Sequence, residues 1–263
     1  MRVLRQDLLP PALHTELRRE GIDATIAVQA RNTLEETDFL LSLAADNPFI
    51  AGAIGWIDLQ SDELAQHLER WRDQPPLRGF RHTLQDESDM DAYVNDSHFQ
   101  RSLNLLQRRG YVYEVLVREP QLTSATALCS RHGAHWLVLD HLGKPAICSD
   151  SRAEWARALQ PFRNMAHVIC KLSGLVTEAD RGTDGFEDGT LWPYMDTALE
   201  VFGPQRLMFG SDWPVCLLSA SYQRVHRIVR EWSTKLSADE QSALWGGTAI
   251  QTYGLKQKGG TWT

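Results

Sequence analysis

The chain has 263 residues, of which 43% are hydrophobic and 23% are charged, and its formal net charge is −7 at pH 7. This is the composition of a globular protein with a sizeable core. The acidic balance and the lack of a basic stripe argue against a nucleic-acid partner, and no apolar run is long enough to span a membrane.

A helix from Pro11 to Glu20 is the first predicted element. After it, short apolar runs alternate with longer amphipathic stretches. The runs are almost continuously hydrophobic, which predicts strands buried on both faces, as in a parallel sheet. In chain order they are Ala24–Ala30, Phe49–Leu59, Leu77–His82, Tyr111–Val117, His135–His141, His167–Gly174 and Arg206–Asp212.

The stretches between the runs predict helices. Thr33, followed three residues later by Glu36, is typical of a capping box. Gly110 is placed to end the helix before the fourth run. The stretch Thr177–Thr190 is rich in Gly and Asp, so we expect a mobile loop over whatever the fold holds.

Strands alternating with helices along the whole chain predict a parallel α/β fold, most commonly a TIM (β/α)8-type barrel. A doubly wound open sheet is the alternative, but no glycine-rich phosphate loop follows any run. We find no linker or repeat and expect a single domain over residues 1–263. Seven runs rather than eight predict a barrel that lacks its first β-strand.

Polar residues gather where the predicted strands end, and these ends build the active site of a parallel barrel. Asp212 and His141 are the strongest candidates, because a buried carboxylate or imidazole without a partner would be costly. They suit hydrolysis, with Asp212 as a base, or a site in which both bind a divalent metal ion. The candidate substrate-binding residues are Trp56, Arg81, His82, Lys144 and Trp213.

Several of these residues also have structural interpretations. Arg81 suits an anionic substrate or a developing oxyanion, but it could instead pair with Glu114 or Asp140. His82 could be a rim histidine with its partners already satisfied. Lys144 could be solvated in its loop.

Three motifs together resemble one family: Leu137–Pro145 (LVLDHLGKP), Cys170–Leu175 (CKLSGL) and Arg206–Val215 (RLMFGSDWPV). They are similar to the amidohydrolase-related branch of the amidohydrolase superfamily, and within it to the sugar-lactonase-like group of L-fuconolactonases and L-rhamnonolactonases. The resemblance implies a barrel that hydrolyses lactones. Asp212 would be its general base, His141 the histidine of the LVLDHLGKP motif, and Arg81 a contact for lactone or carboxylate oxygens.

Members of this branch carry an H-x-H pair on their first strand, and this sequence contains none. An N-terminal truncation is the simplest hypothesis for the missing strand and the missing pair. Only His141 and Asp212 would then be left as metal ligands. We therefore expect either no required cofactor or a weakly bound divalent ion such as zinc in a full-length form.

The expected partner is a small sugar lactone or a related anionic cyclic ester, in a possible homo-oligomer. The chain has no C-x-x-C motif and no signal peptide, which predicts a cytoplasmic protein with reduced thiols. A metal-dependent decarboxylase of the same superfamily is the enzymatic alternative. The non-enzymatic alternatives are a truncated, inactive remnant and a barrel that binds a sugar acid without turnover.

Overall fold

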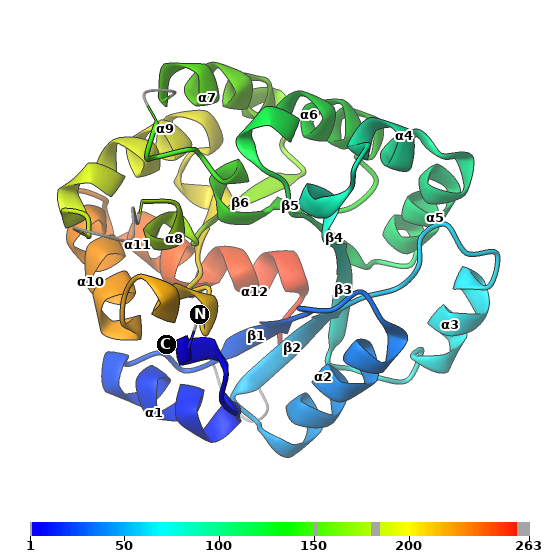
Figure 1. The fold of residues 1–263 in the computed structure, drawn as a ribbon. Helices are drawn as coiled ribbons and strands as arrows, with labels where there is room; N and C mark the ends of the chain where they lie inside the picture. Colours follow the sequence, from blue (N-terminus) through cyan, green and yellow to red (C-terminus); the bar gives the residue numbers. More distant parts are fainter. Residues whose placement is uncertain (1, 150–151, 180–184, 257–263) are drawn as a thin grey trace.

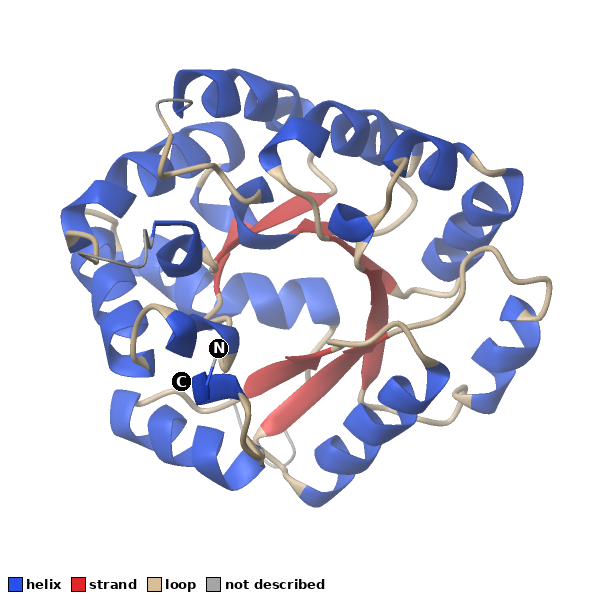
Figure 2. Ribbon diagram, viewed as in Figure 1, coloured by secondary structure: helices blue, strands red, loops and turns tan. Residues whose placement is uncertain are grey.

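The structure, a computed structural model, describes residues 2–149, 152–179 and 185–256. Its described strands form one parallel sheet, paired in sequence order from β1 at one end to β7 at the other. The sheet is strongly curled, and helices surround its outer face (Figure 1, Figure 2). Every strand lies within its predicted run: β1 (Thr25–Val28), β2 (Ile50–Gly55), β3 (Leu77–His82), β4 (Val112–Val115), β5 (Leu137–Leu139), β6 (Val168–Leu172) and β7 (Leu207–Phe209).

The α-helices follow the predicted alternation. They are α1 (Pro10–Glu20), α2 (Leu34–Asp46), α3 (Leu64–Arg70), α4 (Met90–Asn95), α5 (Ser97–Arg108), α6 (Leu122–Arg131), α7 (Arg152–Leu159), α8 (Leu175–Ala179), α9 (Trp192–Phe202), α10 (Tyr222–Ser233), α11 (Ala238–Ser242) and α12 (Thr248–Tyr253). None of the described helices is both long and apolar enough to cross a membrane.

Two local predictions need correction. The Thr33 side chain caps α2 by accepting the Glu36 N–H, but the Glu36 carboxylate accepts from the Ala30 N–H instead of completing the capping box. The predicted loop Thr177–Thr190 is partly helical, because its first residues end α8 and Asp188 begins a short 3-10 helix. Residues 180–184 of this stretch lie outside the described residues.

The strand pleat separates two cores. Residues such as Ala53, Phe80 and Leu139 face the helices and belong to the larger hydrophobic cluster. The alternate residues face inward and form a second cluster with Tyr253 of α12: Ile54, Val112, Val138, Ile169 and Met208. Since side chains alternate along a strand, the next inward position lies two residues nearer the carboxyl ends.

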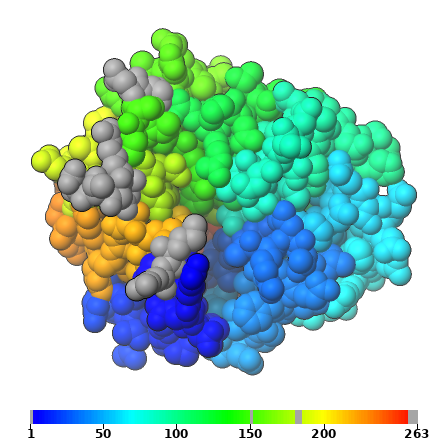
Figure 3. All heavy atoms as spheres, in the orientation of Figure 1, coloured from blue at the N-terminus to red at the C-terminus, as the bar shows by residue number. Residues whose placement is uncertain are grey.

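The helical layer closes, although β1 and β7 do not pair. Gln223 of α10 donates to Glu16 of α1 at 2.5 Å, and His226 of α10 pairs with Glu20 of α1 at 2.9 Å. Helix α12 lies deeper in the view, near the space between β7 and β1 (Figure 1). On the near face, the dark blue N-terminal residues lie against the orange segment that follows β7 (Figure 3).

Candidate active site

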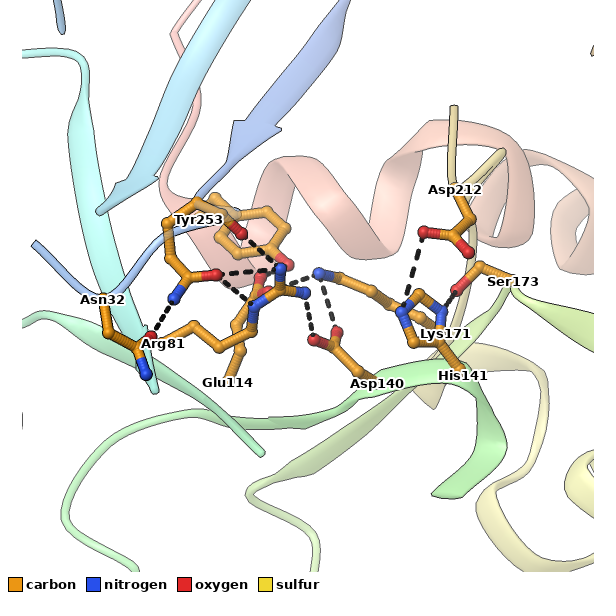
Figure 4. Close-up of polar contacts among 10 residues, drawn as sticks. Asn32, Arg81, Glu114, Asp140, His141, Lys171, Ser173, Asp212 and Tyr253 are labelled. Carbon is orange, nitrogen blue, oxygen red and sulfur yellow. Dashed lines mark hydrogen bonds and ion pairs between the residues drawn. The ribbon is translucent and has the colours of Figure 1, made fainter. Parts of the chain in front are cut away.

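A layer of charged side chains lies inside the sheet, one pleat beyond the inward apolar residues. Glu114, Asp140 and Lys171 each follow an inward apolar residue by two positions, and Arg81 lies opposite Glu114 in the register. Lys171 Nζ lies 2.5 Å from Glu114 Oε2 and 2.9 Å from Asp140 Oδ1. Arg81 Nη1 lies 2.8 Å from Asp140 Oδ2 (Figure 4). Two cations thus balance two carboxylates.

Burial and pairing set the ionisation of this layer. Burial opposes the charge of Asp140, but Lys171 and Arg81 outweigh it and hold the pKa of that carboxyl well below its usual value. For Glu114, burial and the neighbouring Asp140 prevail and raise the pKa. Burial also opposes the charge of Lys171, but Asp140 and Glu114 overcome it and raise the pKa of the ammonium group. Both carboxylates are fully buried, so this network depends on its two cations.

Tyr253 and Gln29 extend the layer at its two ends. The Tyr253 hydroxyl, from α12, donates to Glu114 Oε1 at 2.6 Å. Arg81 donates through Nε and Nη2 to Gln29 Oε1, and through Nη2 to the Gln29 carbonyl. With its bond to Asp140, the guanidinium has at most one N–H left for another acceptor. Of the two structural interpretations of Arg81, the ion pair with Asp140 is present, and an ion pair with Glu114 is not.

His82 and Trp56 lie together at another part of the strand ends. Trp56 Nε1 donates to His82 Nδ1 at 3.0 Å, and His82 Nε2 lies 2.7 Å from Glu87 Oε1. The His82 ring also stacks on Tyr93, with 4.7 Å between ring centroids. Both ring nitrogens of His82 are thus occupied by protein groups.

His141 and Asp212 meet across the end of the sheet. His141 Nε2 lies 3.8 Å from Asp212 Oδ1, and His141 Nδ1 lies 2.8 Å from Ser173 Oγ (Figure 4). Burial lowers the pKa of His141, although Asp212 and Asp140 oppose this. The exposed fractions of the two side chains are 9% for His141 and 18% for Asp212, so the pair is open to solvent mainly on the carboxylate side.

The backbone at this pair is left-handed. His141, Leu142, Gly143 and Lys144 all have positive φ angles, and Asp212 has a φ of 54°. Non-glycine residues pay about 1 to 2 kcal/mol for this conformation. Such strain commonly occurs at functional sites, and here it turns both candidate catalytic side chains at the ends of their strands.

Lys144 and Trp213 lie next to this pair in the chain. Lys144 is half-buried, and its backbone N–H donates to the His141 carbonyl at 2.8 Å. Its side chain makes no hydrogen bond or ion pair within the part of the chain that the structure describes. Burial lowers its pKa, while Glu178 and Asp212 act in the opposite direction. Trp213 is half-buried and packs against the larger hydrophobic cluster.

Two of these side chains, those of His141 and Asp212, are placed to donate to one metal ion. His141 Nε2 and Asp212 Oδ1 are 3.8 Å apart. Within residues 2–149, 152–179 and 185–256, no three His, Cys, Asp or Glu side chains form a group that could hold a metal ion. Zinc sites in proteins supply three or four ligands. The described residues do not make a complete zinc site, so we derive no step through a metal.

The site residues predicted from the sequence did not include Tyr253, Gln29 or Gly174. Gly174 follows Ser173 with a φ of 71°, and a Cβ there would lie 2.8 Å from His141 Cγ. The glycine in the CKLSGL motif was a signal for this close approach. Tyr253 had no local signal, because it lies 139 residues from Glu114.

Comparison with known proteins places the chain in a family. A family model described as amidohydrolase matches residues 2–255. An L-fucono-1,5-lactonase of Burkholderia multivorans is 52% identical, over 98% of this chain and 89% of that protein. An L-fucono-1,5-lactonase of Burkholderia ambifaria is 30% identical, over 97% of this chain and 88% of that protein.

A solved structure is also similar to this chain over nearly its whole length. The crystal structure of a Burkholderia multivorans amidohydrolase with bound zinc is 52% identical, with a TM-score of 0.94 over 97% of this chain and 92% of that chain. These matches confirm the resemblance found in the three sequence motifs. The chain therefore belongs to the amidohydrolase family.

Proposed function

We propose that the chain hydrolyses the lactone ring of a sugar acid, with L-fucono-1,5-lactone as the first candidate substrate. The 52% identity to an L-fucono-1,5-lactonase over nearly the whole chain carries this proposal. The neighbouring Asp212 and His141 at the strand ends are consistent with it, because they place an imidazole 3.8 Å from a carboxylate that is partly open to solvent.

Asp212 is the proposed general base. Its carboxylate takes a proton from a water molecule, which attacks the lactone carbonyl, and ring opening yields a hydroxy acid. His141 and Lys144 are the proposed stabilisers of the oxyanion that forms on the carbonyl. Arg81 contributes less directly, since Gln29 and Asp140 take most of its N–H groups.

The remaining candidate residues would shape the substrate pocket. Trp56 offers an indole face whose N–H is already bound to His82, so we assign it to ring packing. His82 would then act mainly by orienting Trp56. Trp213 is the proposed wall beside Asp212.

We also propose four broader properties of the chain. The chain is a single barrel domain whose described sheet lacks the first strand, which is supported by the unpaired ends at β1 and β7 and by the contacts between α1 and α10. Its reaction requires no metal ion, or it binds zinc only weakly through His141 and Asp212. Cys129, Cys170 and Cys216 are free and buried, in line with a cytoplasmic location. It could act as a homo-oligomer.

Lactone opening with a pH indicator tests the proposed base. Asp212→Asn should lower kcat by at least about a hundredfold, because general base catalysis contributes about 10² to 10⁴. Asp239→Asn, at an exposed position on α11, is the matched control and should leave the rate unchanged. Undiminished turnover by Asp212→Asn would rule out this base, and no turnover by the unmodified chain would rule out the lactonase.

A further inference from the structure

His141 contacts the Ser173 hydroxyl through Nδ1, and the direction of this hydrogen bond depends on the tautomer of the ring. A serine hydroxyl can donate one hydrogen bond and accept others, and neutral imidazole carries one N–H and one acceptor nitrogen. His141 Nδ1, at 2.8 Å, is the one hydrogen-bond partner of the Ser173 hydroxyl within the described residues. If Nδ1 carried the hydrogen, the buried hydroxyl would have to accept it and leave its own O–H without an acceptor.

An unsatisfied buried donor is costly, whereas donation from Ser173 Oγ to His141 Nδ1 satisfies both groups. Counted over the whole residue, Ser173 is 5% exposed and His141 is 7% exposed, so little solvent reaches this contact. The hydrogen of the neutral ring then lies on Nε2, which faces Asp212 (Figure 4).

The ring has little freedom to take another orientation. A Cβ at residue 174 would lie 2.8 Å from His141 Cγ and Nδ1, so the imidazole packs directly on the Gly174 backbone. Ser173 and Gly174 are consecutive in the chain, so the residue that donates to His141 lies next to the residue on which the imidazole packs. The 3.8 Å from Nε2 to Asp212 Oδ1 is too long for a direct hydrogen bond.

We propose that Ser173 is a positioning residue that donates a hydrogen bond to His141 Nδ1, so that Nε2 carries the ring hydrogen and faces Asp212. In this form His141 donates a hydrogen bond into the space beside Asp212, where an oxygen of the substrate would accept it. In the proposed reaction, Asp212 takes the proton from water, while His141 polarises the lactone carbonyl and does not act as a second base. This consequence rests on the proposed lactonase function.

Long-range proton–nitrogen NMR of the histidine rings measures the tautomer directly. The full-length chain, labelled with nitrogen-15 and dialysed against a chelator, is measured without substrate, and His141→Gln identifies the His141 signals. The expected result is a hydrogen on Nε2 and a hydrogen-bonded, unprotonated Nδ1. A hydrogen on Nδ1 would overturn the proposal. Because no substrate is present, this result is independent of whether the chain is a lactonase.

Ser173→Ala then tests the positioning role. We expect its Nδ1 signal to shift and kcat for lactone opening to fall about five- to tenfold with little change in KM, the effect of losing one orienting hydrogen bond. Ser233→Ala is the control, because Ser233 is also a buried serine and its hydroxyl donates to the Arg230 carbonyl within α10. An Nδ1 signal in Ser173→Ala identical to that in Ser233→Ala would overturn the proposal even if the alanine variant lost activity.

Discussion

Replacing Lys171 with Met tests whether the buried charged layer depends on its cations. Lys171 contacts Glu114 at 2.5 Å and Asp140 at 2.9 Å, and both carboxylates are fully buried. The variant keeps the volume of the side chain but leaves two carboxylates with Arg81 alone. Removing one partner of a buried pair costs about 3 to 5 kcal/mol, a large part of the 5 to 15 kcal/mol that typically separates folded from unfolded protein.

The loss should depend on pH in a defined direction. Without Lys171, a carboxyl group of Glu114 or Asp140 holds its proton in the folded state, so its folded pKa rises above the unfolded value of about 4. Such a group contributes stability below the unfolded pKa, and this contribution is lost as the pH rises through the folded pKa. The deficit in unfolding free energy relative to the unmodified chain should therefore be larger at pH 8 than at pH 5.

Urea unfolding at these two pH values is the assay, with two controls. Lys171→Met combined with Glu114→Gln restores the charge balance and keeps an acceptor for Tyr253, so it should recover most of the loss. Lys235→Met removes an exposed partner of Asp196 and should cost less than about 1 kcal/mol. If Lys171→Met lowers the unfolding free energy no more than Lys235→Met, the buried charged layer does not depend on Lys171.

Three further predictions concern single sites. Gly174→Ala should lower both the melting temperature and kcat, and more so than Gly21→Ala, because both glycines have a φ of 71° but nothing lies within 4 Å of an added Cβ at Gly21. Tyr253→Phe removes a donor to Glu114 and should lower the unfolding free energy by about 1.5 to 3 kcal/mol in urea. Burial lowers the pKa of His132 to about 4 in the folded state. As the pH falls, the unfolded state therefore binds a proton on His132 at a higher pH than the folded state does. Stability should fall as the pH drops from about 6.5 toward 4, and His132→Gln should flatten this slope in urea titrations; an unchanged slope would contradict the assignment.

Local patterns in the sequence were enough to identify the elements. Each of the seven apolar runs contains a strand of the sheet, and the helix predicted from Pro11 to Glu20 is α1 within one residue. Strand and helix periodicities are properties of neighbouring residues, so they can be read without knowing the fold. Because the carboxyl ends of parallel strands share one edge, the sequence also predicted that His141 and Asp212 would lie close together, and they do.

Only the tertiary structure decided which charges pair and which remain available. Arg81 was an expected substrate contact, but Gln29 and Asp140, which lie 52 and 59 residues away, occupy most of its donors. Tyr253 reaches Glu114 from a helix near the end of the described chain. These contacts depend on how the curled sheet and α12 bring distant segments within hydrogen-bond distance. No local pattern encodes that distance, so the sequence determined the elements and the edge where the site lies, and the packing of those elements determined the state of each side chain within it.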